Sequence, residues 1–204
     1  MIPLILDLSK ERILVFGAGN VGVRKANHFA GNCRITIVSR SISPDALTLP
    51  GTSIKQLDTA DIEDDDLRKM IEKHDFIIAA LSDTAENERI CRIAQETGKW
   101  YNSAADVGNF LIPSVIAGEE YTLAVSTSGS SPAVPKYIRE QLTEEFKGLD
   151  NMIRLQKTLR ETLKTTIDSQ EKRAEILRAV LHDDTIWNAC AAGKPCDDLI
   201  ARYL

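Results

Sequence analysis

Cysteines, long apolar runs and positive charge are all scarce in this sequence. The four cysteines have the spacing of no disulfide framework, which predicts free thiols in a reducing, cytoplasmic compartment; they are Cys33, Cys91, Cys190 and Cys196. No stretch is long and apolar enough to cross a bilayer, so we expect no membrane segment. The N-terminal stretch MIPLILDLSKER has neither a basic leader nor a small-residue cleavage site, so we expect no signal peptide.

Acidic residues outnumber basic ones, 30 to 25, which gives a formal net charge of -5. This balance argues against general nucleic-acid binding. Cys190 and Cys196 have no further cysteine or histidine at the spacing of a structural zinc site, so ordinary packing is favoured and we predict no metal site. The apolar content of 43% is ordinary, and 204 residues suffice for one sizeable domain with a smaller appendage.

The most informative stretch that is present is RILVFGAGNVG, residues 12–22. Its glycines, Gly17, Gly19 and Gly22, match G-x-G-x-x-G between a short apolar run and a helical pattern. In such a turn the first glycine permits the tight bend, the second lets the backbone approach a pyrophosphate, and the third lets the helix pack close to the strand. The helix then directs free N–H groups and its positive dipole end at the phosphates. The sequence therefore predicts a bound dinucleotide.

Strands and helices alternate through the first half of the chain. We expect helices over 61–73 and 84–97, and further strands over 34–38, 53–57, 75–80 and 100–103. This alternation predicts an α/β, Rossmann-like fold, in which helices cover both faces of a parallel sheet. The apolar segment 2–8 is expected to pack on the first strand as an edge segment.

The pattern changes near Pro113. Two β-rich runs, 110–117 and 121–126, predict a hairpin, and the polar stretch STSGSSP predicts a loop. A helix is expected from Pro132 or Pro135 to about residue 146, followed by amphipathic helices over 151–167 and 171–181.

The cofactor-side candidates follow the second and fourth strands. Where an NAD-binding domain usually carries a carboxylate, this sequence has Arg40 and Ser41. Arg40 with its neighbouring serines suits the 2′-phosphate of NADP, but it suits equally a solvated arginine that stacks on adenine, so both cofactors stay open. Ser82 and Asp83 either line the cofactor crevice or, in the case of Asp83, cap the next helix.

Two further groups are candidates for the substrate side. Asp106 follows the fifth strand at the same edge of the sheet, where it is either a general base or electrostatic partner or a turn aspartate that bonds its own backbone. The run that contains Ser126, Thr127 and Ser128 offers hydroxyls and backbone N–H groups before a helix. It is either an anion site or a helix-entry loop without a ligand.

Taken together, residues 1–146 resemble the precorrin-2 dehydrogenase / sirohydrochlorin ferrochelatase family, which also forms the N-terminal part of sirohaem synthases. The matching pieces stand in family order: PLILDLSKERILVFGAGNVGVRKA, IIAALSD, NERI, YNSAAD, FLIPSVI and YTLAVSTSGSSPAVPKYIREQL. The resemblance implies NAD-dependent oxidation of the tetrapyrrole precorrin-2 to sirohydrochlorin. It also allows a second activity, in which ferrous iron is inserted to give sirohaem.

The resemblance further implies roles for individual residues. Asp106 is the counterpart of an aspartate that serves both steps in the family, and the hydroxyl-rich loop binds substrate, with Thr127 at the position that is phosphorylated in some members. Four residues fall where family members contact NAD: Asn20, Val21, Arg40 and Ser41.

The resemblance also implies a three-part organisation: an NAD-binding domain over 1–113, a dimerisation and substrate-loop region over 114–150, and a helical C-terminal domain over 151–204. Family dimers exchange the central strands and helices, so we expect a homodimer.

A nucleotide-sensing regulatory module of the Rossmann type is the competing interpretation. Such a module needs the glycine turn, but it needs neither a carboxylate at Asp106 nor the STSGSSP loop. Because both are present, we favour the enzyme.

Overall fold

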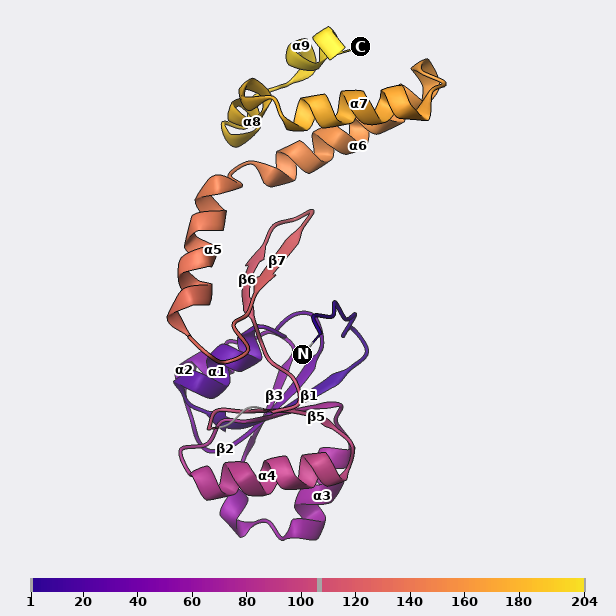
Figure 1. Ribbon diagram of the computed structural model, residues 1–204. Helices are drawn as coiled ribbons and strands as arrows, with labels where there is room; N and C mark the ends of the chain where they lie inside the picture. The colour runs from indigo at the N-terminus through magenta and orange to yellow at the C-terminus, as the bar shows by residue number, and fades with distance from the viewer. Residues whose placement is uncertain (1, 106–107, 204) are drawn as a thin grey trace. The chain divides into compact units, whose positions relative to one another are not determined.

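The computed structural model describes residues 2–105 and 108–203, so Asp106 and Val107 lie outside the described residues. The chain divides into two compact units, Met1–Ile112 and Pro113–Leu204. The first unit contains a sheet with helices, and the second contains a hairpin followed by helices (Figure 1).

The first unit is built on a five-stranded parallel sheet with the strand order β3-β2-β1-β4-β5. The strands are β1 (Arg12–Ala18), β2 (Arg34–Ile42), β3 (Thr52–Gln56), β4 (Phe76–Ala79) and β5 (Trp100–Ser103). Strand β1 is central: its run from Ile13 to Phe16 pairs with β2 on one side and with β4 on the other. This position explains the unbroken apolar run, since both faces of the strand are covered. The predicted α/β, Rossmann-like class is confirmed.

Alternate side chains of β1 enter separate cores on the two faces of the sheet. Ile13 and Val15 pack with residues of α1 (Asn20–Asn27) and α2 (Pro44–Leu47). Leu14 and Phe16 pack with residues of α3 (Asp64–Glu72) and α4 (Thr84–Glu96). In Figure 1 the two pairs of helices accordingly lie on opposite sides of the sheet.

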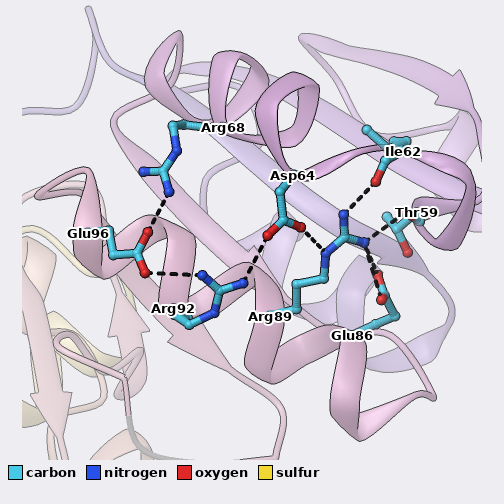
Figure 2. A network of polar contacts seen from close by, with 8 residues as sticks. All are labelled: Thr59, Ile62, Asp64, Arg68, Glu86, Arg89, Arg92 and Glu96. Atoms are coloured by element: carbon cyan, nitrogen blue, oxygen red, sulfur yellow. Dashed lines mark hydrogen bonds and ion pairs between the residues drawn. The ribbon is translucent and has the colours of Figure 1, made fainter.

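Ion pairs and hydrogen bonds link α3 to α4 (Figure 2). Arg89 lies at the centre: its guanidinium contacts the carboxylates of Asp64 and Glu86 and the carbonyl oxygens of Thr59 and Ile62. Arg92 joins Asp64 to Glu96, which Arg68 also contacts. The carbonyls of Thr59 and Ile62 belong to the turn η1 (Thr59–Asp61) and its end, so the network also fixes the entry to α3.

The second unit begins with an antiparallel hairpin of β6 (Ser114–Ala117) and β7 (Thr122–Val125). Five helices follow: α5 (Ala133–Glu145), α6 (Leu149–Thr166), α7 (Gln170–Leu181), α8 (Asp184–Ala191) and α9 (Asp197–Ile200), and then the turn η2 (Ala201–Tyr203). Residues of α6, α7 and α8 form a separate apolar core around Met152, Leu159 and Leu163. The predicted helical C-terminal region is thus present.

Three local expectations differ from the structure. Segment 2–8 forms no strand, and Ile2, Leu4 and Ile5 are exposed. Only Leu8 packs against the core of the sheet, so the expected packing of the whole segment on β1 is wrong. The helix expected from residue 61 begins at Asp64, because Asp58 caps a separate turn before it. The strand expected from residue 110 begins at Ser114, since Phe110 instead packs on the core and accepts a hydrogen bond from the Asn102 amide. None of the helices among the described residues is long and apolar enough to cross a membrane.

Candidate functional site

The glycine turn joins β1 to α1 at the carboxyl end of the sheet. Gly17 has φ +107°, and a Cβ there would lie 2.3 Å from the carbonyl oxygen of Ala80. A Cβ on Gly22 would lie 2.0 Å from the carbonyl oxygen of Gly17. Both glycines are therefore required by the fold itself, because any side chain would collide with backbone atoms.

Gly19 differs from its two neighbours. Its backbone is extended, and a Cβ there would meet no protein atom within 4 Å. Gly19 is exposed, as are Asn20 and Val21, which open α1, and the first turn of α1 carries no acidic residue. The structure therefore leaves this glycine's space for a ligand, and the N–H groups of the helix start suit a pyrophosphate. These residues fit a dinucleotide, which they would hold by its phosphates.

At the end of β2, Arg40 has an acidic partner that sequence reasoning missed. Its Nη1 lies 3.3 Å from Oδ2 of Asp58, which follows β3, and its carbonyl accepts a hydrogen bond from the Gln56 amide. Arg40 is mostly exposed and Ser41 is exposed beside it. A carboxylate is thus present near the expected ribose position, but it comes from the neighbouring strand rather than from β2.

The turn after β4 brings Ser82 to the same edge of the sheet as the glycine turn. Ser82 is exposed, whereas Asp83 caps α4 by accepting hydrogen bonds from the N–H groups of Ala85 and Glu86. The buried Asn87 fixes the turn, since its side chain both accepts from Leu81 N and donates to Leu81 O at 2.9 Å. Of the two alternatives for Asp83, the structure favours the cap.

The end of β5 is tied to α1 by a lysine. Lys25 Nζ donates to the side-chain oxygen of Asn102 at 2.5 Å and to the carbonyl oxygen of Ser103 at 2.7 Å. Half-burial lowers the pKa of Lys25 to about 8. The candidate base Asp106 follows three positions later in the sequence and lies outside the described residues.

The hydroxyl-rich loop lies in the second unit, between β7 and α5. The Thr127 hydroxyl closes the loop, because it donates to Ser131 O at 2.9 Å and accepts from Ser131 N at 3.2 Å. Ser126 accepts from the N–H of Ser128, and Ser128 takes the left-handed backbone conformation with φ +53°. Ser126 and Ser128 are exposed, so their side chains are accessible to an anion.

The described residues include no group of three or more His, Cys, Asp or Glu side chains arranged to hold a metal ion. The Sγ atoms of Cys190 and Cys196 lie 3.8 Å apart inside the helical core. Burial, together with the neighbouring thiol, raises the pKa of Cys190 to about 11, so this sulfur stays protonated at neutral pH.

The sheet edge and its glycine turn define a dinucleotide-binding protein, and residues 4–114 match a family model described as putative NAD(P)-binding. Over its whole length the chain is 40% identical to a precorrin-2 dehydrogenase of Methanosarcina barkeri, 95% of which is covered. It is 31% identical to a putative precorrin-2 dehydrogenase of Methanocaldococcus jannaschii, with 90% of this chain and 91% of that protein aligned. The chain therefore belongs to the precorrin-2 dehydrogenase family, a family of oxidoreductases.

A solved structure supports the fold. SirC, a precorrin-2 dehydrogenase, matches with a TM-score of 0.69 and 23% sequence identity over 92% of each chain. This likeness speaks for the arrangement of strands and helices, and the residue roles rest on the site described above.

Proposed function

We propose that this chain oxidises precorrin-2 to sirohydrochlorin and transfers the hydride to NAD. The observation that carries the proposal is Gly19, the one glycine of the turn whose missing side chain serves no packing need. In a member of the precorrin-2 dehydrogenase family, that open position at the start of α1 marks the cofactor site. NAD, when bound, supplies the hydride acceptor.

NAD is preferred over NADP in this proposal because of Asp58. The carboxylate of Asp58 already pairs with Arg40, the cation that a 2′-phosphate would need. A phosphate placed there would meet the negative charge of Asp58 as well. The ribose hydroxyls of NAD, by contrast, are good donors to a carboxylate.

Asp106 is proposed as the group that accepts the proton lost alongside the hydride. In the sequence it follows by three positions Ser103, whose carbonyl Lys25 holds at the carboxyl edge of the sheet. The hydroxyl-rich loop is proposed to bind the carboxylates of the tetrapyrrole through the exposed Ser126 and Ser128. Thr127 closes the loop by its hydrogen bond to Ser131.

We also propose a homodimer, with residues 114–150 as the dimerisation region between the NAD-binding domain, 1–113, and the helical domain, 151–204. A two-stranded hairpin is marginally stable alone, and the apolar side chains of β6 and β7 are at most partly buried. The exposed side chains of Ile2, Leu4 and Ile5 add apolar surface for a second copy to cover. Light scattering should give twice the chain mass, and a monomer at micromolar concentration would refute this part.

The free thiols fit a reducing compartment, and we propose the cytoplasm.

The assay follows precorrin-2 oxidation by absorbance with NAD and then with NADP. We expect turnover with NAD, and slower turnover with NADP. Asp106→Asn keeps the side-chain size but removes the base, so kcat should fall about a hundredfold with KM little changed. Asp83→Asn is the matched control, since asparagine also caps helices and α4 should stay intact.

The outcomes separate the alternatives. NAD binding without turnover would replace the enzyme by a nucleotide-sensing module. Near wild-type turnover of Asp106→Asn would leave Asp106 as a turn residue. Adding ferrous iron to the product then tests iron insertion, for which iron is a substrate, and sirohaem formation would extend the proposal to chelation.

A further inference from the structure

Lys25 is a half-buried cation that has no acidic partner in the part of the chain that the structure describes. Among the described residues no carboxylate lies within ion-pair distance of its Nζ, which bonds only the neutral oxygens of Asn102 and Ser103. Lysine is seldom buried unless it is paired, because its ammonium loses hydration. The lowered pKa of Lys25 reflects this desolvation first and the charge of Arg24 second, with an opposing effect of Cys91 on α4.

One acceptor, Ser103, ends β5, and the other, Asn102, connects Lys25 to the described stretch after residue 107. The amide of Asn102, which is buried, accepts from Lys25 and donates to Phe110 O at 2.9 Å. On the same stretch, the Asn109 side chain accepts from Tyr101 N at 2.7 Å and donates to Lys99 O at 3.0 Å. The stretch after residue 107 is therefore tied back to β5 at two neighbouring residues, and Lys25 anchors one of the two ties to α1.

Packing does not require a charge at this position. Strand β5 already pairs with β4 along its whole length, and Tyr101 packs on the apolar core. An apolar side chain on α1 would avoid the desolvation cost that the ammonium carries. The ammonium of Lys25 is explained if the reaction at the carboxyl edge of the sheet requires the end of β5 to be held in a fixed position.

We propose that Lys25 is a positioning residue for the dehydrogenation: as an ammonium, it holds the Asn102 side chain and the Ser103 carbonyl and so fixes the end of β5 where the substrate reacts. The inference rests on the proposed function, because it assumes that precorrin-2 reacts at this edge. Lys25 acts through Asn102 and Ser103 and not on the substrate directly.

The protonation state of Lys25 gives the proposal a pH signature. Hydrogen bonds from an ammonium are about twice as strong as those from a neutral amine, so the hold weakens above about pH 8. Within residues 2–105 and 108–203, the groups that face Lys25 are the exposed Arg24 on its own helix, Cys91 on α4 and the neutral Asn102 on β5. An arginine in its place stays charged throughout this range.

The experiment measures kcat, KM and their pH dependence for the full chain with precorrin-2 and NAD. Lys25→Met should lower kcat by roughly tenfold to a hundredfold, since small misplacements of reacting groups have such effects. NAD affinity should stay within about twofold, because the Lys25 ammonium donates its hydrogen bonds to β5 and not to the glycine turn. The alkaline fall of the wild-type rate should shift upward in Lys25→Arg. The matched control is Arg24→Met, which removes the same charge from an exposed neighbour and should leave kcat unchanged.

Hydrogen exchange over residues 100–105 and 108–110 provides a readout that does not depend on turnover. In Lys25→Met these amides should exchange at least about tenfold faster than in the wild type, because the tie to α1 is lost. Unchanged exchange, unchanged kcat in Lys25→Met, or an alkaline limb shared by the wild type and Lys25→Arg would each overturn the inference. If Lys25→Met loses its circular dichroism signal, the pH profile of Lys25→Arg decides. A wild type that is inactive would refute the proposed function, while exchange would still test the role of Lys25.

Discussion

At the scale of single residues, the three positions of the glycine motif are occupied by glycine for different physical reasons. Gly17 and Gly22 are glycine because backbone oxygens occupy the place of a Cβ, whereas nothing in the chain occupies that place at Gly19. A sequence motif contains both kinds of requirement and does not separate them. The structure does, and substitutions at these positions should therefore separate folding from binding.

Gly19→Asp should abolish NAD binding without unfolding the protein. Its side chain fits the open space, but there it displaces the pyrophosphate and adds a repelling charge. Calorimetric titration and thermal melting measure the two effects. Gly17→Ala is the contrasting variant: with φ +107° and a Cβ 2.3 Å from Ala80 O, it should lower the melting temperature markedly. NAD affinity of Gly19→Asp equal to that of the wild type would refute the assignment of this turn.

At the scale of elements, the sequence predicts what depends on local pattern. The buried run of β1 and the period of α6 each lie within a few neighbouring residues, and both elements were predicted close to their observed bounds. The start of α3 was predicted less well, since it begins at Asp64 and not at residue 61. Segment 2–8 was expected to pack on β1 as an edge segment, and this was wrong for all but Leu8, because an apolar pattern does not reveal which surface covers it.

The site residues that sequence reasoning missed depend on contacts between distant segments. The partners of Lys25, Asn102 and Ser103, lie 77 and 78 positions later in the sequence, and Arg40 pairs with Asp58 across 18 positions. Neither pairing follows a helical or strand period, since tertiary packing alone brings the partners together. Lys25 lies in one of the pieces that carry the family resemblance, but the sequence analysis predicted no role for it.

The link between α3 and α4 yields a prediction about stability. Arg89→Met leaves the carboxylates of Asp64 and Glu86 without this cation and the carbonyl of Ile62 without the guanidinium donor. The carbonyl of Thr59 loses one donor and keeps the N–H of Ile62. The Arg89 side chain is only 20% exposed, so the loss should cost about 1–3 kcal/mol of unfolding free energy. Urea denaturation measures it.

Arg92→Met is the control for this position. Arg92 contacts only Asp64 and Glu96 and is 51% exposed, so its replacement should cost about 1 kcal/mol or less. Equal losses for the two variants would mean that exposure does not govern the strength of this network.

At the scale of the whole molecule, the described residues form separate apolar cores in the two units. The cores of the first unit flank its sheet, and that of the second lies among α6, α7 and α8. The glycine turn belongs to the first unit alone. Each unit therefore has an apolar core of its own to stabilise its fold, and we expect a dinucleotide to stabilise only the first unit.

Calorimetry should accordingly show two unfolding transitions, of which NAD raises only one. A ligand present at 100 times its dissociation constant stabilises the folded state by about 2.7 kcal/mol. For a unit of this size, that amount shifts the transition by on the order of 10 °C. The other transition should not move, and Gly19→Asp should show no shift in either. A single transition that NAD moves as a whole would instead show that the two units unfold cooperatively, and that the stability of the helical region depends on the occupied cofactor site.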